Sequence, residues 1–309
     1  MDWNKAIQFG QLVNAAYNAF EGKPYPTPGF DVLATIYGND LATDRNPGRG
    51  DTRVLIGLIL QAQGSGAAVV AIRGTEGIKE WVPDAQFGDT PFAKVAEAGR
   101  TEDGFTAMYK SMTVGNVPGA QTVVDALAGI PWKRPVTSLT ICGHSLGGAL
   151  ATMFALDVAA NKVAPFSPPT VYTYASPRTG NPDFATKYGQ MISTTYRFVD
   201  NVDLVPKLPS PFFPGLPYRH VCEHLGMDSM TLIPPKVRLQ PNPVCWHILS
   251  SYIYLMSLAS GGPVIAPETE CAPLGLVHDI LDHIEEDLSD EKSIRDEFTA
   301  APRTNMGGN

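Results

Sequence analysis

The sequence predicts an α/β fold in which a mainly parallel central sheet is covered by helices on both faces. Two observations lead to this prediction. Apolar segments run evenly along a chain of 309 residues, 44% of them hydrophobic, so a sizeable buried core is available. In addition, strand-like aliphatic runs alternate with helix-like segments, which is typical of chains that build a parallel sheet.

The first part of the chain is predicted to begin with a helix and to continue with strands. Apolar residues recur at i, i+3 and i+4 spacing between positions 9 and 20, and this spacing predicts a helix that faces the core. Runs rich in β-branched and aliphatic residues then predict strands over 30–37, 53–61 and 67–73. A helix is expected over 120–128.

Strands and helices are predicted to alternate in the rest of the chain. Strands are expected over 136–143, 170–175, 194–199 and 218–222, and helices over 146–160, 182–190 and 246–258. A loop stiffened by five prolines spans 206–217, and an apolar stripe predicts a last helix that ends near residue 288. We therefore expect one domain over 1–288 and a polar, frayed tail over 289–309.

Composition and charge exclude several classes of protein. The net charge of −8 at pH 7 repels phosphate backbones, so nucleic acid is not an expected partner. No apolar run approaches the roughly 20 residues that a membrane span needs, and the N-terminus lacks the pattern of a signal peptide. We expect a soluble protein, either cytoplasmic or secreted with its signal already removed, and the sequence leaves its oligomeric state open.

The four cysteines do not form a disulfide scaffold or a C-x-x-C pair. Cys142 lies in an apolar strand and is expected to be a small core residue. The other three, Cys222, Cys245 and Cys271, could form one bridge or none.

A candidate nucleophile stands where an apolar strand meets a helix. The segment Gly143-His144-Ser145-Leu146-Gly147 matches G-x-S-x-G, a motif that is weak when it stands alone. Here a strand ends just before the motif and an Ala- and Leu-rich helix follows, which is the setting of a nucleophile elbow. Glycines on both sides permit a strained turn and close packing of strand and helix. We therefore predict that Ser145 is a nucleophile.

Three motifs occur in the order that is typical of one known family. They are VVAIRGTEGIKEWVPD, GHSLGGALA around Ser145, and RFVDNVDLVPKLP further along the chain. Together they resemble the class 3 lipases, the filamentous-fungal triacylglycerol lipase type, from about residue 10 to about residue 260. The resemblance implies an α/β-hydrolase fold and a catalytic domain over 1–288. It also implies a serine hydrolase of lipid esters, without a cofactor, that acts at a lipid–water interface.

A serine nucleophile needs a base and an acid that orients the base, in the chain order Ser, acid, His. Asp200 and Asp203 both follow a predicted strand. The family's acid stands three residues before a proline, as Asp203 stands before Pro206, so we choose Asp203. Asp200 is the rival, and its alternative interpretation is a solvent-exposed turn residue. By resemblance the base is His247, which precedes a helix that carries Tyr252.

The oxyanion hole of such an enzyme needs two hydrogen-bond donors. The backbone N–H of Leu146, directly after the nucleophile, is one expected donor. By resemblance the other is Thr75, with its backbone N–H and its hydroxyl. The alternative interpretation of the Arg73-Gly74-Thr75 segment is a simple turn at a strand end.

The resemblance also implies a short helical lid over about 76–88 that covers the site until lipid opens it. Its apolar face would carry Ile78, Trp81 and Val82, and the alternative is a permanently packed surface helix. In the Pro-rich loop, Phe212 and Phe213, with Leu216 and Val205, could line an acyl groove or belong to the core.

One position departs from the family pattern. Class 3 lipases usually carry a histidine directly before, or two residues before, the glycine that is Gly104 here, whereas this chain has Glu102 and Asp103. That position supports the site rather than reacting. The departure leaves the chemistry in place but makes the lid contacts and the substrate preference open.

A zinc signature is set aside. His220 and His224 match H-x-x-E-H, but two histidines four apart bind one metal only on a helix, and a strand is predicted here. We expect no metal and no cofactor. The remaining alternatives are a phospholipase or a short-chain esterase with the same machinery, or a lipase-like module that binds without catalysis.

Overall fold

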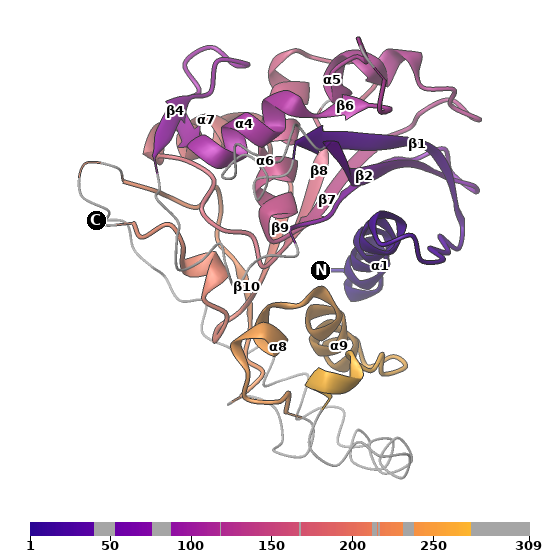
Figure 1. The fold of residues 1–309 in the computed structure, drawn as a ribbon, viewed down its shortest axis with the longest axis vertical. Coiled ribbons are helices and arrows are strands. Elements are labelled where there is room, and N and C mark those ends of the chain that lie inside the picture. The colour runs from indigo at the N-terminus through magenta and orange to yellow at the C-terminus, as the bar shows by residue number, and fades with distance from the viewer. Residues whose placement is uncertain are drawn as a thin grey trace.

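The computed structural model describes residues 1–39, 53–75 and 88–272, except for 118, 167, 212–214, 216 and 231–237. Within these residues the centre is an eight-stranded sheet in the order β10-β9-β8-β7-β3-β2-β1-β6 (Figure 1). Its strands are β1 (Phe30–Asn39), β2 (Arg53–Ala62), β3 (Ala68–Ile72), β6 (Thr113–Val114), β7 (Leu139–His144), β8 (Thr170–Tyr174), β9 (Thr195–Asp200) and β10 (Leu225–Met227). Two further short strands, β4 (Asp89–Pro91) and β5 (Arg100–Glu102), pair with each other.

The sheet is parallel on one side and antiparallel on the other. Strands β3, β7, β8, β9 and β10 pair in parallel. Strand β2 pairs antiparallel with β1 and β3, and β1 pairs antiparallel with β6. The predicted α/β fold is confirmed, and the structure adds an antiparallel edge built by the strands nearest the N-terminus.

Helices cover both faces of this sheet, as the sequence predicts (Figure 1). Helices α4 (Asp103–Ser111), α6 (Leu146–Ala160) and α7 (Pro182–Met191) pack into the hydrophobic core on one face. Helices α1 (Trp3–Phe20) and α9 (Leu249–Ser260) pack on the other. Along β3 the side chains alternate between the two cores, with Val70 in one and Val69 and Ala71 in the other.

The elements nearest the G-x-S-x-G motif agree best with the sequence. The predicted helix over 146–160 is α6, which is buried from Leu146 to Ala159 because it lies between the sheet and the outer helices. The predicted helix over 120–128 is shorter, with α5 (Val123–Ala126) followed by a 3₁₀ turn (Leu127–Gly129).

Two predicted elements differ from the structure. The helix over 246–258 is two helices, α8 (Pro243–His247) and α9, because Ile248 has an extended backbone with φ −61° and ψ 146°. The strand over 218–222 is wrong: Arg219 makes only an isolated bridge to Gly180. The strand of this region is β10, a few residues later. The predicted lid, last helix and tail lie outside the described residues, and the single-domain prediction stays a prediction.

The cysteines resolve the question that the sequence left open. A disulfide joins Cys245 in α8 to Cys271, while Cys142 and Cys222 are free. Cys142 is fully buried, as expected of a core residue. The disulfide ties the short helix that ends at His247 to a segment 26 residues away in sequence from Cys245.

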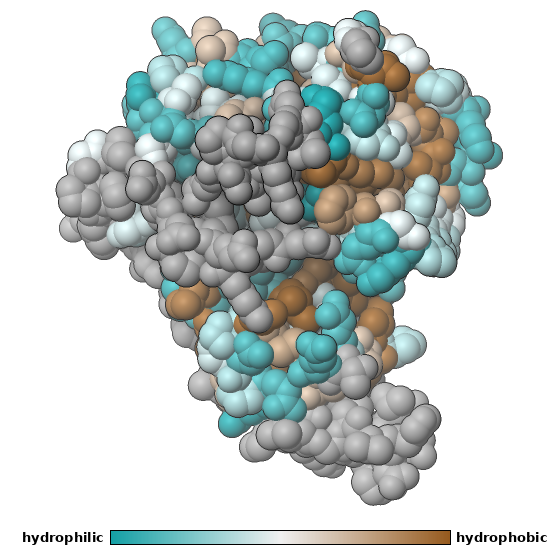
Figure 2. All heavy atoms as spheres, in the orientation of Figure 1, coloured by the Kyte–Doolittle hydropathy of each residue, from teal (hydrophilic) through white to brown (hydrophobic). Residues whose placement is uncertain are grey.

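Apolar side chains reach the surface at the antiparallel side of the sheet. Figure 2 shows apolar side chains over β1 and β2, and most residues of β1 are only half-buried. An antiparallel edge can leave part of one face to solvent in this way. Among the residues that the structure describes, no helix is long and apolar enough to cross a membrane.

Candidate active site

Ser145 occupies a strained turn between β7 and α6. Its backbone has φ 56° and ψ −129°, a region that residues other than glycine rarely enter. A Cβ on Gly143 would lie 2.1 Å from the carbonyl oxygen of Gly147, and a Cβ on Gly147 would lie 2.4 Å from that of Ile72. Both glycines are therefore required for strand and helix to approach, as the motif predicts.

The Arg73-Gly74-Thr75 segment lies against this turn. A Cβ on Gly74 would be 2.9 Å from the Cβ of Ser145, so the chain after β3 and the elbow are in contact. The guanidinium of Arg73 donates to the carbonyl of Gly74 at 2.6 Å. Because C=O and N–H of one trans peptide point in opposite directions, the N–H of Thr75 faces away from Arg73.

The predicted acid and base meet. His247 ends α8, and its Nδ1 lies 2.8 Å from Oδ2 of Asp203, in the turn after β9. Tyr252 donates its hydroxyl to the same oxygen at 2.8 Å, and the backbone N–H of Val205 donates to Oδ1 at 2.9 Å. Asp203 and His247 are 1% and 3% exposed. His247 Nε2 has no hydrogen-bond partner among the described residues, so it is available to a serine or a substrate.

Asp200 is placed differently from Asp203. Its carboxyl accepts the backbone N–H groups of Val202 and Ser229 at 3.4 and 3.2 Å and makes no contact with His247. The expectation of an exposed turn residue is wrong, because Asp200 is fully buried. Its own backbone N–H donates to the Tyr252 oxygen at 3.0 Å. Burial raises the pKa of Asp200 to about 7, and the nearby Asp203 acts in the same direction.

We expect Asp200→Asn to raise the free energy of unfolding near pH 8 by up to about 4 kcal/mol. With a pKa of about 7 in the folded state against an ordinary 3.8, Asp200 keeps a proton that the unfolded chain releases. Its contribution to stability is therefore present below about pH 4 and is lost as pH rises towards 7. An amide keeps an acceptor oxygen for the same N–H groups without this loss.

Urea denaturation of wild type and Asp200→Asn at about pH 4 and about pH 8 measures the effect. The difference between the two proteins should grow with pH. An equal difference at both pH values would contradict the titration of Asp200 as its cause.

Two other histidines of the sequence, His144 and His220, have structural partners. Both ring nitrogens of His144 are hydrogen-bonded, Nδ1 to the Tyr17 hydroxyl and Nε2 to the backbone carbonyl of His247. His220 is held by the carbonyl of Pro206 at 2.8 Å, and burial lowers its pKa. Within the described ranges no group of three or more His, Cys, Asp or Glu side chains could hold a metal ion.

Some predicted site residues cannot be placed. Ile78, Trp81, Val82, Phe212, Phe213 and Leu216 lie outside the described residues. Val205 is described, and it is buried in a 3₁₀ turn (Val205–Lys207) that begins two residues after Asp203.

The departure at Glu102 has a structural role. Its carboxylate accepts the backbone N–H of Phe105 at 2.7 Å and so caps the N-terminus of α4. Glu102 is 3% exposed. The acidic residue therefore stabilises the start of a helix on the outer face of the sheet.

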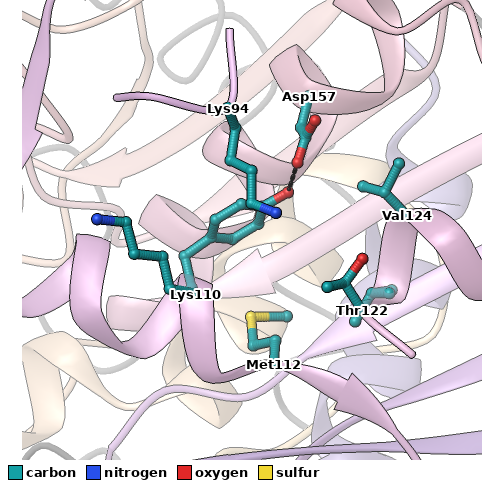
Figure 3. A pocket seen from close by; sticks show the side chains of 8 residues that line it. Lys94, Lys110, Met112, Thr122, Val124 and Asp157 are labelled. Carbon is teal, nitrogen blue, oxygen red and sulfur yellow. Dashed lines mark hydrogen bonds between the residues drawn. The ribbon is translucent and has the colours of Figure 1, made fainter. Parts of the chain in front are cut away.

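A separate pocket lies between α4, α5 and α6. Figure 3 shows Asp157 at this pocket, together with Lys94, Lys110, Met112, Thr122 and Val124. The hydroxyl of Tyr109 and the amide of Asn161 donate to the two oxygens of Asp157, both at 2.6 Å. Asp157 is about 18 Å further along α6 than Ser145, at 1.5 Å per residue. The pocket is thus distinct from the candidate active site.

Similarity to known proteins agrees with the fold and with the motifs. Residues 69–213 match the family described as Lipase (class 3). Phospholipase A1-II 1 of Oryza sativa subsp. indica is 29% identical over 198 residues, 60% of this chain and 49% of that protein. Secreted mono- and diacylglycerol lipase 1 of Fusarium solani is 28% identical over 212 residues, 64% of this chain and 59% of that protein. The chain spans about half the length of the curated relatives it matches.

The fold is shared with solved lipases. A deletion mutant of the Rhizomucor miehei lipase propeptide complex superposes with a TM-score of 0.58 at 22% identity, over 73% of this chain and 67% of that one. At this identity the likeness concerns the α/β-hydrolase fold. The segment that matches the class 3 lipase family covers both the elbow at Ser145 and the turn with Asp203.

Proposed function

We propose that this protein is a serine carboxylic-ester hydrolase that cleaves lipid esters such as triacylglycerols. The observation that carries the proposal is the buried hydrogen bond between Asp203 and His247, 2.8 Å long, beside the strained turn at Ser145. The family supports the reaction class, since relatives in it are named as lipases and phospholipases.

The reaction would proceed through an acyl-enzyme intermediate. His247 Nε2 takes the proton of the Ser145 hydroxyl while Oγ attacks the ester carbonyl. The N–H groups of Leu146 and Thr75 receive the negative charge on the carbonyl oxygen. The imidazolium, held by Asp203, then protonates the leaving alcohol. Water then attacks the acyl carbonyl while His247 takes its proton. The bond to Ser145 breaks, the serine oxygen receives that proton and the carboxylic acid leaves, so no cofactor is required.

The kind of ester is the open part of the proposal. A rice relative is named as a phospholipase A1 and a Fusarium relative as a mono- and diacylglycerol lipase, so the family holds more than one substrate class. A short-chain esterase with the same machinery and a non-catalytic binding module are the other candidates. We place acylglycerols first because the three sequence motifs resemble the triacylglycerol lipase type.

Interfacial action and location are part of the same proposal. Residues 76–88, with Ile78, Trp81 and Val82, would form a lid, and Phe212 and Phe213 would contact the acyl chain. The Cys245–Cys271 disulfide favours an oxidising compartment, and the Fusarium relative is named as secreted. We therefore favour a secreted enzyme.

The test is a substrate profile with p-nitrophenyl esters from short to long acyl chains, followed by triacylglycerol emulsions and phosphatidylcholine vesicles. A fluorophosphonate probe, which labels activated serines, reports the nucleophile by mass spectrometry of the labelled peptide. We expect label on Ser145 and a preference for long-chain acylglycerols. Faster release of fatty acid from phosphatidylcholine would assign a phospholipase. If the protein shows neither turnover nor labelling, the non-catalytic binding module becomes the favoured function.

A further inference from the structure

A partly buried chain of hydrogen bonds lies beside the turn that carries Ser145. The Tyr17 hydroxyl, from α1, lies 2.8 Å from Nδ1 of His144, the last residue of β7. The backbone N–H of Gly74, just after β3, donates to the same hydroxyl at 2.8 Å. At the other end, Nε2 of His144 lies 2.7 Å from the carbonyl oxygen of His247. Four segments that are distant in sequence are thus linked.

The partners of His144 determine its protonation. A carbonyl oxygen only accepts, so the hydrogen between His144 and His247 belongs to Nε2 of His144. In a neutral imidazole Nδ1 is then an acceptor, and the Tyr17 hydroxyl donates to it. Burial lowers the pKa of His144 well below its usual range, and the nearby His247 has the same effect. All hydrogen bonds of the chain therefore run in one direction, from Gly74 through Tyr17 and His144 to His247.

These hydrogen bonds hold two parts of the backbone that matter for the proposed reaction. One is the peptide after Gly74: Tyr17 holds the N–H of Gly74 and Arg73 holds its carbonyl, so the plane that carries the Thr75 N–H cannot rotate freely. The other is the carbonyl of His247, which sets the position of that residue relative to the elbow. The rings of His144 and His247 are 4.9 Å apart, so a charged His144 would oppose an imidazolium on His247.

We propose that Tyr17 and His144 are positioning residues, which hold the oxyanion peptide and the general base in one geometry around Ser145. The inference rests on the proposed ester hydrolysis and extends it to α1, a helix outside the catalytic motifs. Neither residue needs to contact the substrate. Their effect is expected in the transition state, where the oxyanion and the imidazolium both form, and not in ground-state binding.

The first test is Tyr17→Phe, assayed with a soluble short-chain ester. We expect kcat to fall about 10- to 100-fold with less than about a twofold change in KM, because a small misplacement of reacting groups costs rate. A boronic acid that mimics the tetrahedral intermediate should bind more weakly by the same factor as kcat. A loss of packing alone would not couple these two quantities.

The matched control is Tyr188→Phe. Tyr188 lies in α7, and among the described residues its hydroxyl bonds the Thr195 hydroxyl, at 2.8 Å, at the start of β9 and away from Asp203. It should lower the thermal midpoint by an amount similar to Tyr17→Phe and leave kcat unchanged. Equal kcat values for wild type and Tyr17→Phe would overturn the positioning role.

A second pair of variants separates the two bonds of His144. In His144→Gln the amide nitrogen can occupy the place of Nε2 and donate to the His247 carbonyl. In His144→Asn the amide reaches only the place of Nδ1 and the Tyr17 hydroxyl. We expect the Gln variant to retain several-fold more kcat than the Asn variant, and the reverse order would contradict a role for the bond to His247.

Failure of this inference can be told from failure of the proposed function. Wild-type turnover and fluorophosphonate labelling are measured first. If both are absent, ester hydrolysis itself is refuted, and the inference with it. If both are present and Tyr17→Phe matches the wild type, only the positioning role is refuted.

Discussion

Replacing Ser145 with alanine is expected to lower kcat for ester hydrolysis by about a million-fold. The serine oxygen forms the acyl-enzyme in the proposed reaction, and the segment from Gly143 to Gly147 contains no second hydroxyl or thiol. The strained backbone at Ser145 places that oxygen at the N-terminus of α6, where backbone N–H groups face the developing charge. The residual rate should reflect binding and the oxyanion donors alone.

The measurement is single-turnover and steady-state hydrolysis of one soluble ester by wild type and variant. Ser251→Ala is the matched control, because Ser251 is fully buried and its hydroxyl has no hydrogen-bond partner among the described residues. This control should retain wild-type kcat. Turnover within about tenfold of wild type in Ser145→Ala would exclude the serine as nucleophile.

The elbow could be predicted from the sequence because its requirements are local. A strand, a glycine pair and a helix follow one another within a few residues, and each has a clear signature in residue type and spacing. Helix α6 has the predicted bounds, since every residue from Leu146 to Ala159 is buried and small or aliphatic residues dominate.

The chain from Tyr17 to His247 could not be predicted in the same way. Its bonds join residues 127 and 103 positions apart, and no spacing in the sequence records such contacts. The G-x-S-x-G motif explains the glycines on either side of His144 and Ser145. It does not explain the histidine, because the hydrogen-bond partners of His144 lie in α1 and α8. Long-range packing, not local propensity, decides these contacts.

The choice of Asp203 over Asp200 rests on the resemblance to a family and not on the local sequence pattern. Asp200 is the last residue of β9 and Asp203 follows the strand, and burial alone does not separate them, because both are inaccessible to solvent. The turn after β9 directs Asp203 to the histidine and Asp200 to backbone N–H groups. Only the tertiary position of His247 distinguishes the two carboxylates.

Asp203→Asn is expected to lower kcat by about ten-thousand-fold at neutral pH. An amide nitrogen facing His247 Nδ1 would donate to it, so the imidazole would carry its proton on Nε2 and could not accept the serine proton. The hydroxyl of Tyr252 donates to the same carboxylate oxygen and would lose its charged acceptor. Stabilisation of the imidazolium by Asp203 would also be lost.

The contrast with Asp200→Asn makes this result specific. Asp200 shares the burial of Asp203 and shares Tyr252 as a neighbour, but makes no contact with His247. Its amide variant should keep wild-type kcat on a soluble ester and gain stability near pH 8. If Asp200→Asn instead lost activity and Asp203→Asn retained it, the acid of the triad would be Asp200. Rates for the two variants, measured with fully folded protein at one pH, therefore decide between carboxylates only three residues apart.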